Sequence, residues 1–187
     1  LLAATAQANT LTIHVINVGW GQSVLIQGPN GKSLLFDAGL KSKRQRVQDY
    51  LSAQNIQQLD YFVLSHNHAD HGGGATMVVQ SFAPRQSFYS GSSMNTERVF
   101  MQDWFNAYQD AGVSAPQAMP LGHRIDLGDG ASATAVAVNG QILQQAAVIT
   151  ALQTEFPGYV FPTVSHINDA AVVLLVQYQG FDYLISG

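Results

Sequence analysis

A short polar segment directly after an apolar run constrains this chain more than any other part of its sequence. The run Tyr61-Phe62-Val63-Leu64 is typical of a buried strand. The segment after it, Ser65-His66-Asn67-His68-Ala69-Asp70-His71, contains three of the six histidines and one carboxylate. A strand that ends in such a cluster presents polar side chains at the edge of a sheet, where a rigid scaffold commonly carries a functional site.

The spacing within the cluster suits metal binding. His66 and His68 are two residues apart, so at a strand end both side chains point to one face. The loop then turns, and Asp70 and His71 can reach a neighbouring point. Imidazole and carboxylate are ligands of zinc and similar divalent metals, and two such ions about 3.5–4 Å apart form a hydrolytic site. We therefore expect His66 and His68 to bind a first ion and Asp70 and His71 a second.

Two other interpretations of the cluster are open. Its histidines could be polar loop residues without a ligand, but three of them beside an aspartate are unusual in a chain with only 11% charged residues. The cluster could hold a purely structural zinc, but such sites are usually closed by four ligands and often use cysteine. The chain has no cysteine, so disulfides and thiolate ligands are excluded and any metal must bind nitrogen and oxygen.

The charge balance limits the partners. The chain has 187 residues, enough for one domain with a sizeable core, and 47% of them are hydrophobic. The net charge is -4 with eight Lys plus Arg, so no broad basic face is available for a nucleic-acid backbone. If a polyanion such as DNA is bound, metal ions must supply much of the positive charge.

The first residues predict export. Residues 1–8 are small and apolar, and Ala6-Gln7-Ala8 fits a small-x-small cleavage site. We interpret residues 1–8 as the remnant of a signal peptide and residues 9–187 as one domain of a periplasmic or extracellular protein. The alternative is the frayed N-terminus of a cytosolic domain. No other segment has the roughly 20 apolar residues that a membrane span requires.

The order of the expected elements predicts an α/β fold with two sheets faced by helices. Period-two patterns and turn residues predict strands over 11–18, 23–27, 33–37, 61–64, 86–90, 124–127, 133–138, 170–178 and 181–186. Helical spacing predicts helices over 41–54, 96–111 and 141–153, and another around Met77, Val78 and Phe82. Trp104 is expected in the core, Trp20 and Tyr89 are candidates for lining a groove, and Ser23 and Ser65 are interpreted as turn residues.

The cluster matches, position by position, the His-x-His-x-Asp-His motif of the metallo-β-lactamase superfamily. The chain resembles this family elsewhere too. Residues 14–23 resemble the opening strand of one branch, with its Gly-x-Gly-x-Ser turn, and Leu35-Phe36-Asp37-Ala38-Gly39 matches the strand that ends in Asp-x-Gly. Residues 121–130 and 168–176 resemble later strands. That branch includes the hydrolase domain of ComEC-type DNA-uptake (competence) proteins and related secreted hydrolases.

The resemblance implies a four-layer αββα sandwich, truncated at the C-terminus, with a two-metal site. His166 would be the third ligand of the first metal, Asp37 would orient a ligand or the loop, and Asn168 and Asp169 could line the site. His14 is interpreted as a strand-face residue and His123 as a turn residue. In the family the last strand runs into Gly-Asp, whose aspartate bridges both metals, and a further histidine follows. We expect both beyond Gly187; otherwise the protein is degenerate.

The function that the resemblance implies is metal-dependent hydrolysis by a metal-activated water, on phosphodiester or other ester-type bonds. Asp70 would orient the nucleophile as well as bind metal. The expected cofactors are two divalent ions, with Zn²⁺ favoured over Mn²⁺ or Fe²⁺, and the expected partner is a small-molecule or phosphodiester substrate, with DNA as one candidate. The alternatives are a degenerate, non-catalytic binding module and a lactonase or β-lactamase-type hydrolase.

Overall fold

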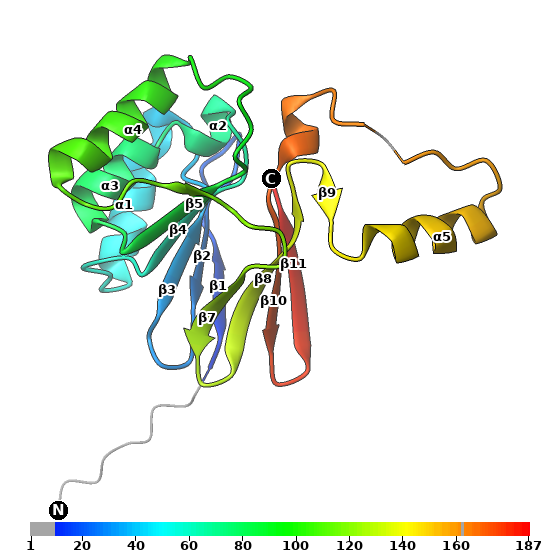
Figure 1. Ribbon diagram of the computed structural model, residues 1–187. Helices are drawn as coiled ribbons and strands as arrows, with labels where there is room; N and C mark the ends of the chain where they lie inside the picture. The colour runs from blue at the N-terminus through cyan, green and yellow to red at the C-terminus, as the bar shows by residue number, and fades with distance from the viewer. Residues whose placement is uncertain (1–9, 162) are drawn as a thin grey trace, which may run out of the picture.

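Two β-sheets packed face to face form the body of the molecule, and helices cover the outer face of the first sheet (Figure 1). The computed structural model describes residues 10–161 and 163–187. Residues 1–8, which the sequence predicts to be the remnant of a signal peptide, lie outside the described residues. Within the described part, no helix has both the length and the apolar composition needed to cross a bilayer.

The first sheet contains six strands in the order β1-β2-β3-β4-β5-β6. Neighbours from β1 to β3 are antiparallel, and neighbours from β3 to β6 are parallel. The parallel part places the carboxyl ends of β3, β4 and β5 at one edge of the sheet. The strands are β1 (Thr12–Val15), β2 (Val24–Gln27), β3 (Ser33–Phe36), β4 (Tyr61–Leu64), β5 (Gln86–Tyr89) and β6 (Gln117–Ala118).

The second sheet is antiparallel throughout, in the order β11-β10-β8-β7, with β9 paired to β8. Its central strands bring segments that are far apart in the sequence side by side. The strands are β7 (Arg124–Gly128), β8 (Ala131–Val138), β9 (Gln141–Ile142), β10 (Val173–Tyr178) and β11 (Phe181–Ser186).

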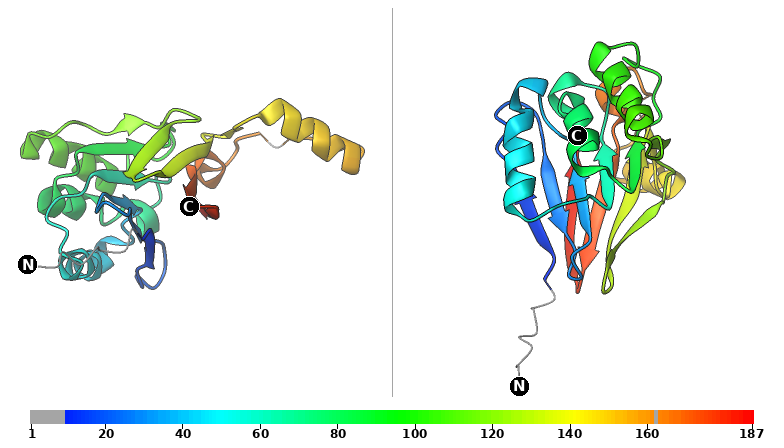
Figure 2. Two further views of the ribbon diagram at one scale, coloured as in Figure 1. Left: turned by 90° about the horizontal axis from the view of Figure 1, so that it is seen from below. Right: turned by 90° about the vertical axis from the view of Figure 1, so that its left-hand side faces the viewer.

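Three helices pack on the first sheet, namely α1 (Arg44–Ala53), α3 (Ala75–Phe82) and α4 (Val99–Ala111). The single turn α2 (Ala69–Gly72) follows β4, and two short 3-10 helices are η1 (Lys41–Lys43) and η2 (Ile167–Ala170). The helix α5 (Gln145–Glu155) has no buried residue and extends away from the sheets (Figure 2).

Alternating side chains of the first sheet pack into two separate hydrophobic cores, one under the helices and one between the two sheets. In β2, Leu25 packs among the helices, whereas its neighbours Val24 and Ile26 pack against the second sheet. Because both faces are covered, these strands read as continuous apolar runs in the sequence. The same alternation in β3 and β4 sends Leu35, Phe62 and Leu64 toward the helices and Leu34, Phe36 and Val63 toward the second sheet.

The α/β sandwich that the sequence predicts is confirmed, and the strands over 61–64 and 181–186 match β4 and β11. Several predicted bounds are wrong: the strand over 11–18 is Thr12–Val15, the helix over 96–111 begins at Val99, and two further differences have a visible cause. The helix over 141–153 begins only at Gln145, because residues 141–142 pair with β8 and Gln144 has a left-handed φ of 56°. The strand over 170–178 begins only at Val173, because the Asp169 carboxylate accepts the N–H groups of residues 165 and 166 and stabilises η2.

Truncating the centre of β4 should destabilise the whole fold. Phe62 is fully buried, and its ring lies edge-on to Trp104 with centroids 5.9 Å apart. We expect Phe62→Ala to lower the free energy of unfolding by about 3–5 kcal/mol, because it leaves a cavity in the core. Urea denaturation followed by circular dichroism measures this loss.

Phe181→Ala is the matched control, since Phe181 is 52% exposed at the start of β11. We expect it to change the free energy of unfolding by about 0.5 kcal/mol or less. Similar losses for the two variants would contradict the placement of β4 at the centre of the core.

Candidate functional site

The carboxyl ends of β3 and β4 bring the candidate site together. The two strands are parallel neighbours, and the backbone N–H of Asp37 donates to Val63 O at 2.9 Å. Asp37 follows β3, and Ser65 and His66 follow β4, so the three residues meet at one sheet edge. All three are buried, with exposed fractions of 0%, 0% and 2%. The edge at which the sequence predicts a site is therefore also the place where buried polar groups gather.

The Asp37 carboxylate organises this edge. It accepts hydrogen bonds from Ser65 N (2.7 Å), Ser65 Oγ (2.7 Å) and His71 Nδ1 (2.7 Å). Ser65 Oγ also lies 2.9 Å from His66 Nδ1. Because the hydroxyl proton goes to the carboxylate, Ser65 Oγ accepts from His66 Nδ1–H. Asp37 therefore acts on both rings, directly on His71 and through Ser65 on His66.

These contacts set the tautomers of both histidines. When Nδ1 of a neutral imidazole carries the proton, Nε2 keeps its lone pair. The Nε2 atoms of His66 and His71 are thus the ones left for a ligand. A histidine whose other nitrogen donates to a carboxylate or similar acceptor is the usual arrangement of a metal-binding imidazole.

The candidate ligand atoms lie in two pairs, and the members of the first pair are within hydrogen-bond distance of each other. His66 Nε2 is 3.0 Å from His68 Nδ1, and His71 Nε2 is 3.9 Å from Asp70 Oδ2. Two ligands of one tetrahedral zinc ion, each bonded at about 2.0–2.2 Å, lie roughly 3.3–3.6 Å apart. Both separations are close to that spacing, so the donor chemistry and the pairing fit divalent ions, in the two pairs that the sequence predicts.

The coordination around each pair is incomplete. Among the residues that the structure describes, no group of three or more His, Asp or Glu side chains surrounds a common point that could hold an ion. His166, predicted as the third ligand, is exposed at the start of η2, where its backbone N–H donates to Asp169 Oδ2 at 2.8 Å. No described hydrogen bond or ring contact joins the His166 side chain to the cluster. Its role as a ligand stays a prediction.

The site shifts the pKa values of two histidines in opposite directions. Burial, reinforced by the charge of His71, lowers the pKa of His66 to about 4. Burial also acts to lower the pKa of His71, but the hydrogen bond and charge of Asp37, with the charge of Asp70, raise it above the ordinary 6.5. Without a metal, the site therefore keeps His66 neutral at pH values where His71 is protonated.

Neighbouring loops close around the cluster from both sheets. Gln22 N donates to Asp70 O at 3.2 Å, and Gly21, with φ of 98°, approaches that carbonyl so closely that any Cβ would collide with it. Gln22 Nε2 donates to Ser186 O at 3.0 Å at the end of β11. The adjacent Gly187 lies against Ser65 and His66, where a Cβ would also collide. The cluster is thus held at the junction of the two sheets.

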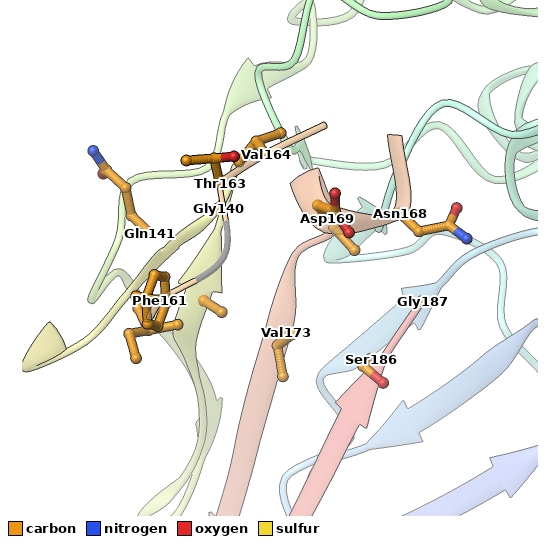
Figure 3. A pocket seen from close by; sticks show the side chains of 13 residues that line it. Gly140, Gln141, Phe161, Thr163, Val164, Asn168, Asp169, Val173, Ser186 and Gly187 are labelled. Atoms are coloured by element: carbon orange, nitrogen blue, oxygen red, sulfur yellow. The ribbon is translucent and has the colours of Figure 1, made fainter. Parts of the chain in front are cut away.

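A cavity of about 250 Å³ adjoins the cluster on the side of the second sheet. Figure 3 shows Asn168, Asp169 and the end of β11 along one side and Gln141 and Phe161 along the other. Its lining is mostly apolar, and Gly187 belongs both to this lining and to the contact with His66. Asn168 and Asp169 therefore line a cavity next to the cluster, and that they line the metal site itself stays a prediction.

The remaining histidines lie elsewhere, as predicted. His14 Nδ1 is 3.0 Å from Tyr50 Oη across β1 and α1, and the His123 ring lies 5.0 Å from the Phe88 ring just before β7. Trp104 is fully buried, as expected of a core residue, whereas Trp20 is 79% exposed on the loop that approaches Asp70.

Sequence reasoning missed Ser65 and Asn67. Ser65, interpreted as a turn residue, transmits the hydrogen bond of Asp37 to His66. Asn67 is fully buried and donates to Ser92 O (3.2 Å) and Met94 O (2.8 Å), which fastens the loop after β5 to the cluster. The only signal for either was its position next to a predicted ligand.

A family model described as the metallo-beta-lactamase superfamily matches residues 17–135 of the chain. These residues make up more than half of the sequence and include β4, the whole histidine cluster and Asp37. Among curated proteins, no significant match was found.

Solved structures share the fold at low sequence identity. A metallo-β-lactamase from Cronobacter sakazakii with a HARLDQ motif is 18% identical, with a TM-score of 0.58 over 92% of this chain and 57% of its own. MEM-A1, a subclass B3 metallo-β-lactamase from a soil metagenome library, is 14% identical, with a TM-score of 0.57 over 96% of this chain and 60% of its own. The metallo-β-lactamase SMB-1 in complex with mercaptoacetic acid is 15% identical, with a TM-score of 0.58 over 93% of this chain and 59% of its own. This chain therefore spans less than two thirds of each of them.

Titration of the metal-free protein should resolve the two histidines. With EDTA present to remove metal ions, we expect a pKa of about 4 for His66 and a pKa above 6.5 for His71. His66 then contributes stability that is present above pH 6.5 and lost as the pH falls toward 4. His71 contributes stability that is present below pH 6.5 and lost as the pH rises through its raised pKa. Ring chemical shifts measured by NMR report each titration.

Asp37→Asn should lower the pKa of His71. It removes the charge of Asp37 and weakens its hydrogen bond, so that burial, which lowers this pKa, is opposed mainly by the charge of Asp70, and we expect His71 to titrate at lower pH than in the unaltered protein. Asp49→Asn is the control, because Asp49 lies on α1 and bonds Gln45 instead. An unchanged His71 titration in Asp37→Asn would contradict the hydrogen-bond network described above.

Proposed function

The chain belongs to the metallo-β-lactamase superfamily, and on this premise we propose that it is a metal-dependent hydrolase of phosphodiester or other ester-type bonds. The observation that carries the proposal is the geometry of the donors. His66 with His68, and Asp70 with His71, form two pairs at one sheet edge. Asp37 orients the rings of His71, directly, and of His66, through Ser65, so that their Nε2 atoms face the other member of each pair. Members of the superfamily are mostly metal-dependent hydrolases, which agrees with this donor set.

The residues of the chain divide the work of such a site. His66 and His68 would hold one divalent ion and Asp70 and His71 a second, with zinc favoured by the nitrogen-rich donors. When bound, the ions supply an activated water and polarise the oxygen of the target bond. Asp37 fixes the orientation of the His71 ring by accepting a hydrogen bond from Nδ1. The Asp70 carboxylate, which is 26% exposed, would orient the attacking water. No serine or cysteine nucleophile is needed.

The proposal includes a substrate class, phosphodiesters, and a location outside the cytoplasm. The turn at residues 19–23 resembles the Gly-x-Gly-x-Ser turn of the ComEC-type branch, and here it packs against the backbone of Asp70. This supports phosphodiesters as the substrate class, with DNA as one candidate and export to the periplasm or outside the cell as the setting. Lactone or β-lactam substrates are the alternative within the same chemistry.

A non-catalytic binding module is the competing function. It is favoured by one observation, the lack of a group of three or more donors around a common point in residues 10–161 and 163–187. The metal content of the full-length protein separates the two functions, since catalysis by this mechanism needs about two ions per chain.

Removing a predicted ligand should abolish both metal binding and hydrolysis in the full-length protein. We expect His68→Ala to lower the metal content measured by mass spectrometry. It should also lower hydrolysis of bis(p-nitrophenyl) phosphate at least about 100-fold, since even partners of ligands cost about 10–100-fold when mutated. Asp70→Ala should do the same, and EDTA should abolish the activity of the unaltered protein.

His123→Ala is the control, because His123 packs on Phe88 and lies outside the cluster. It should keep its metal content and its rate. Retained hydrolysis in His68→Ala and Asp70→Ala would refute the assignment of the site. A full-length protein that binds no metal would favour the binding module, and cleavage of a lactone or a β-lactam in preference to the phosphodiester would correct the substrate class.

A further inference from the structure

Half of the cations of the chain are gathered in one short turn. Residues 41–46, Lys-Ser-Lys-Arg-Gln-Arg, contain four of the eight Lys and Arg, and no acidic residue lies between Asp37 and Asp49. This basic turn comprises η1 and the first three residues of α1. Cations at the start of a helix face the positive end of its dipole, so the arrangement costs stability. A local rule that is broken without a compensating gain often marks a functional position.

Few contacts within the protein offset the charge of the basic turn. Lys41 Nζ lies 3.4 Å from Asp103 Oδ2, and because both side chains are exposed, the pair contributes little. Within residues 10–161 and 163–187, Lys43 makes no ion pair and no side-chain hydrogen bond, and Arg44 donates to the carbonyl of Lys41. Lys43 and Arg46 are three residues apart, so their side chains lie on one side of the turn, where an anion can reach both.

Arg46 connects the basic turn to the loop between β1 and β2. Its Nη1 donates to Asn17 O at 3.4 Å. The same loop reaches the histidine cluster at its other end, where Gln22 N donates to Asp70 O at 3.2 Å. The basic turn also lies directly against the ligand loop, because a Cβ on Gly73 would collide with the backbone nitrogen of its first residue. The cations and the predicted metal ligands therefore border one loop.

Trp20 lies in the middle of this loop and is 79% exposed. Single exposed apolar residues are common on protein surfaces, but this one stands on backbone that is fixed on both sides. Gly19 N donates to Asn17 Oδ1 at 3.0 Å, and Gly21 packs against Asp70 O. Among the residues that the structure describes, nothing makes a hydrogen bond or a ring contact with the indole. An ordered loop therefore holds a large aromatic face in solvent, between the basic turn and the metal ligands.

An aromatic face beside a group of cations is the combination that binds single-stranded nucleic acid. Bases stack on aromatic side chains, and Lys and Arg bind the phosphates of the backbone. A duplex conceals the faces of its bases, so only the cations could bind it. One short basic turn does not make the broad basic face that tight binding of a duplex requires. The surface thus favours a single strand.

We propose that Trp20, Lys43 and Arg46 form a surface that binds single-stranded nucleic acid next to the histidine cluster. A base stacks on the Trp20 ring, and neighbouring phosphates bind Lys43 and Arg46. Three side chains reach only roughly two or three nucleotides, so a longer strand gains little further affinity. That the bound strand is also the substrate rests on the proposed hydrolase function, whereas the binding itself does not.

Binding of an oligonucleotide in the presence of EDTA tests the surface without any metal. A fluorescein-labelled thymidine decanucleotide is titrated with the full-length protein, and its anisotropy gives Kd. With about two phosphate contacts, log Kd should rise with the logarithm of the salt concentration at a slope of about 1.4. The duplex formed with the complementary strand should bind at least about fivefold more weakly. Absence of binding at low salt, or equal binding of the duplex, would overturn the proposal.

Two double variants of equal charge test the position of the cations. Lys43→Gln with Arg46→Gln should weaken binding about five- to tenfold, whereas Arg85→Gln with Arg124→Gln should change it less than about twofold. Arg85 precedes the amino end of β5, opposite the edge that carries the cluster, and Arg124 begins β7. Each double variant removes two positive charges. Equal effects would show that only net charge matters, and would refute the surface.

The stability of the first double variant shows whether weaker binding reflects damage to the fold. Removing two cations from the start of α1 relieves an unfavourable interaction with the helix dipole. Lys43→Gln with Arg46→Gln should therefore unfold at the same or a higher urea concentration than the unaltered protein. Weaker binding at unchanged or raised stability supports the surface. A lower unfolding midpoint would show that the cations serve the fold, and would contradict the proposal.

Trp20 is tested through its own fluorescence. The chain has two tryptophans, and Trp104 is fully buried, so quenching by the strand reports on Trp20. Trp20→Ala should abolish the quenching and weaken binding at least about fivefold, whereas Trp20→Phe should bind within about twofold of the unaltered protein. An oligonucleotide of abasic sites, which keeps the phosphates alone, should bind the unaltered protein and Trp20→Ala alike. Quenching that persists in Trp20→Ala, or an unchanged affinity of this variant for the decanucleotide, would overturn the proposal.

Kinetics of the full-length protein with metal present separate the surface from the hydrolase function. Lys43→Gln with Arg46→Gln should raise KM for the decanucleotide about five- to tenfold with little change in kcat. KM for the small bis(p-nitrophenyl) phosphate should stay within about twofold, and equal rises for both substrates would refute the substrate assignment. If the unaltered protein cleaves neither substrate but still binds the decanucleotide through Trp20, the hydrolase function fails and the surface stands. Cleavage of bis(p-nitrophenyl) phosphate without any binding of the strand would overturn the surface and leave the hydrolase function standing.

Discussion

The buried carboxylate of Asp37 is the group on which the candidate site depends. It sits at the end of β3, and its three accepted hydrogen bonds reach the backbone and hydroxyl of Ser65 and the ring of His71. A charge buried this deeply is stable only when its lone pairs are satisfied. The same bonds that stabilise Asp37 therefore fix the loop after β4, so the order of the site follows from the need to satisfy one buried group.

The sheet supplies the proximity that this network requires. Because β3 and β4 are parallel, their carboxyl ends lie at one edge, and residues 28 positions apart in the sequence meet there. The strands are buried on both faces, which leaves little freedom for a shift of register. The second sheet closes the arrangement, since the N–H of Val172 donates to Ser65 O at 2.9 Å. The site is thus held by backbone contacts from both sheets.

The cluster and its edge could be predicted because local patterns encode them. An apolar run followed by histidines at spacing two identifies both the strand and the face that carries the ligands. The Asp-x-Gly that ends β3 could be interpreted through its resemblance to the family motif. The role of Ser65 could not be predicted, because it depends on the distance between two strands. The role of Asn67 was out of reach as well, since it depends on the loop after β5, whose carbonyls at Ser92 and Met94 it bonds.

Within the proposed function, the charge of residues 1–187 favours a small or single-stranded phosphodiester as the substrate over a DNA duplex. Duplex binding draws on many phosphate contacts along a basic face, whereas this chain has eight Lys plus Arg and a net charge of -4. Under the proposed function, a phosphodiester would therefore be held mainly by the metal ions that the donor pairs of the cluster would bind, and little affinity would come from the rest of a long polyanion.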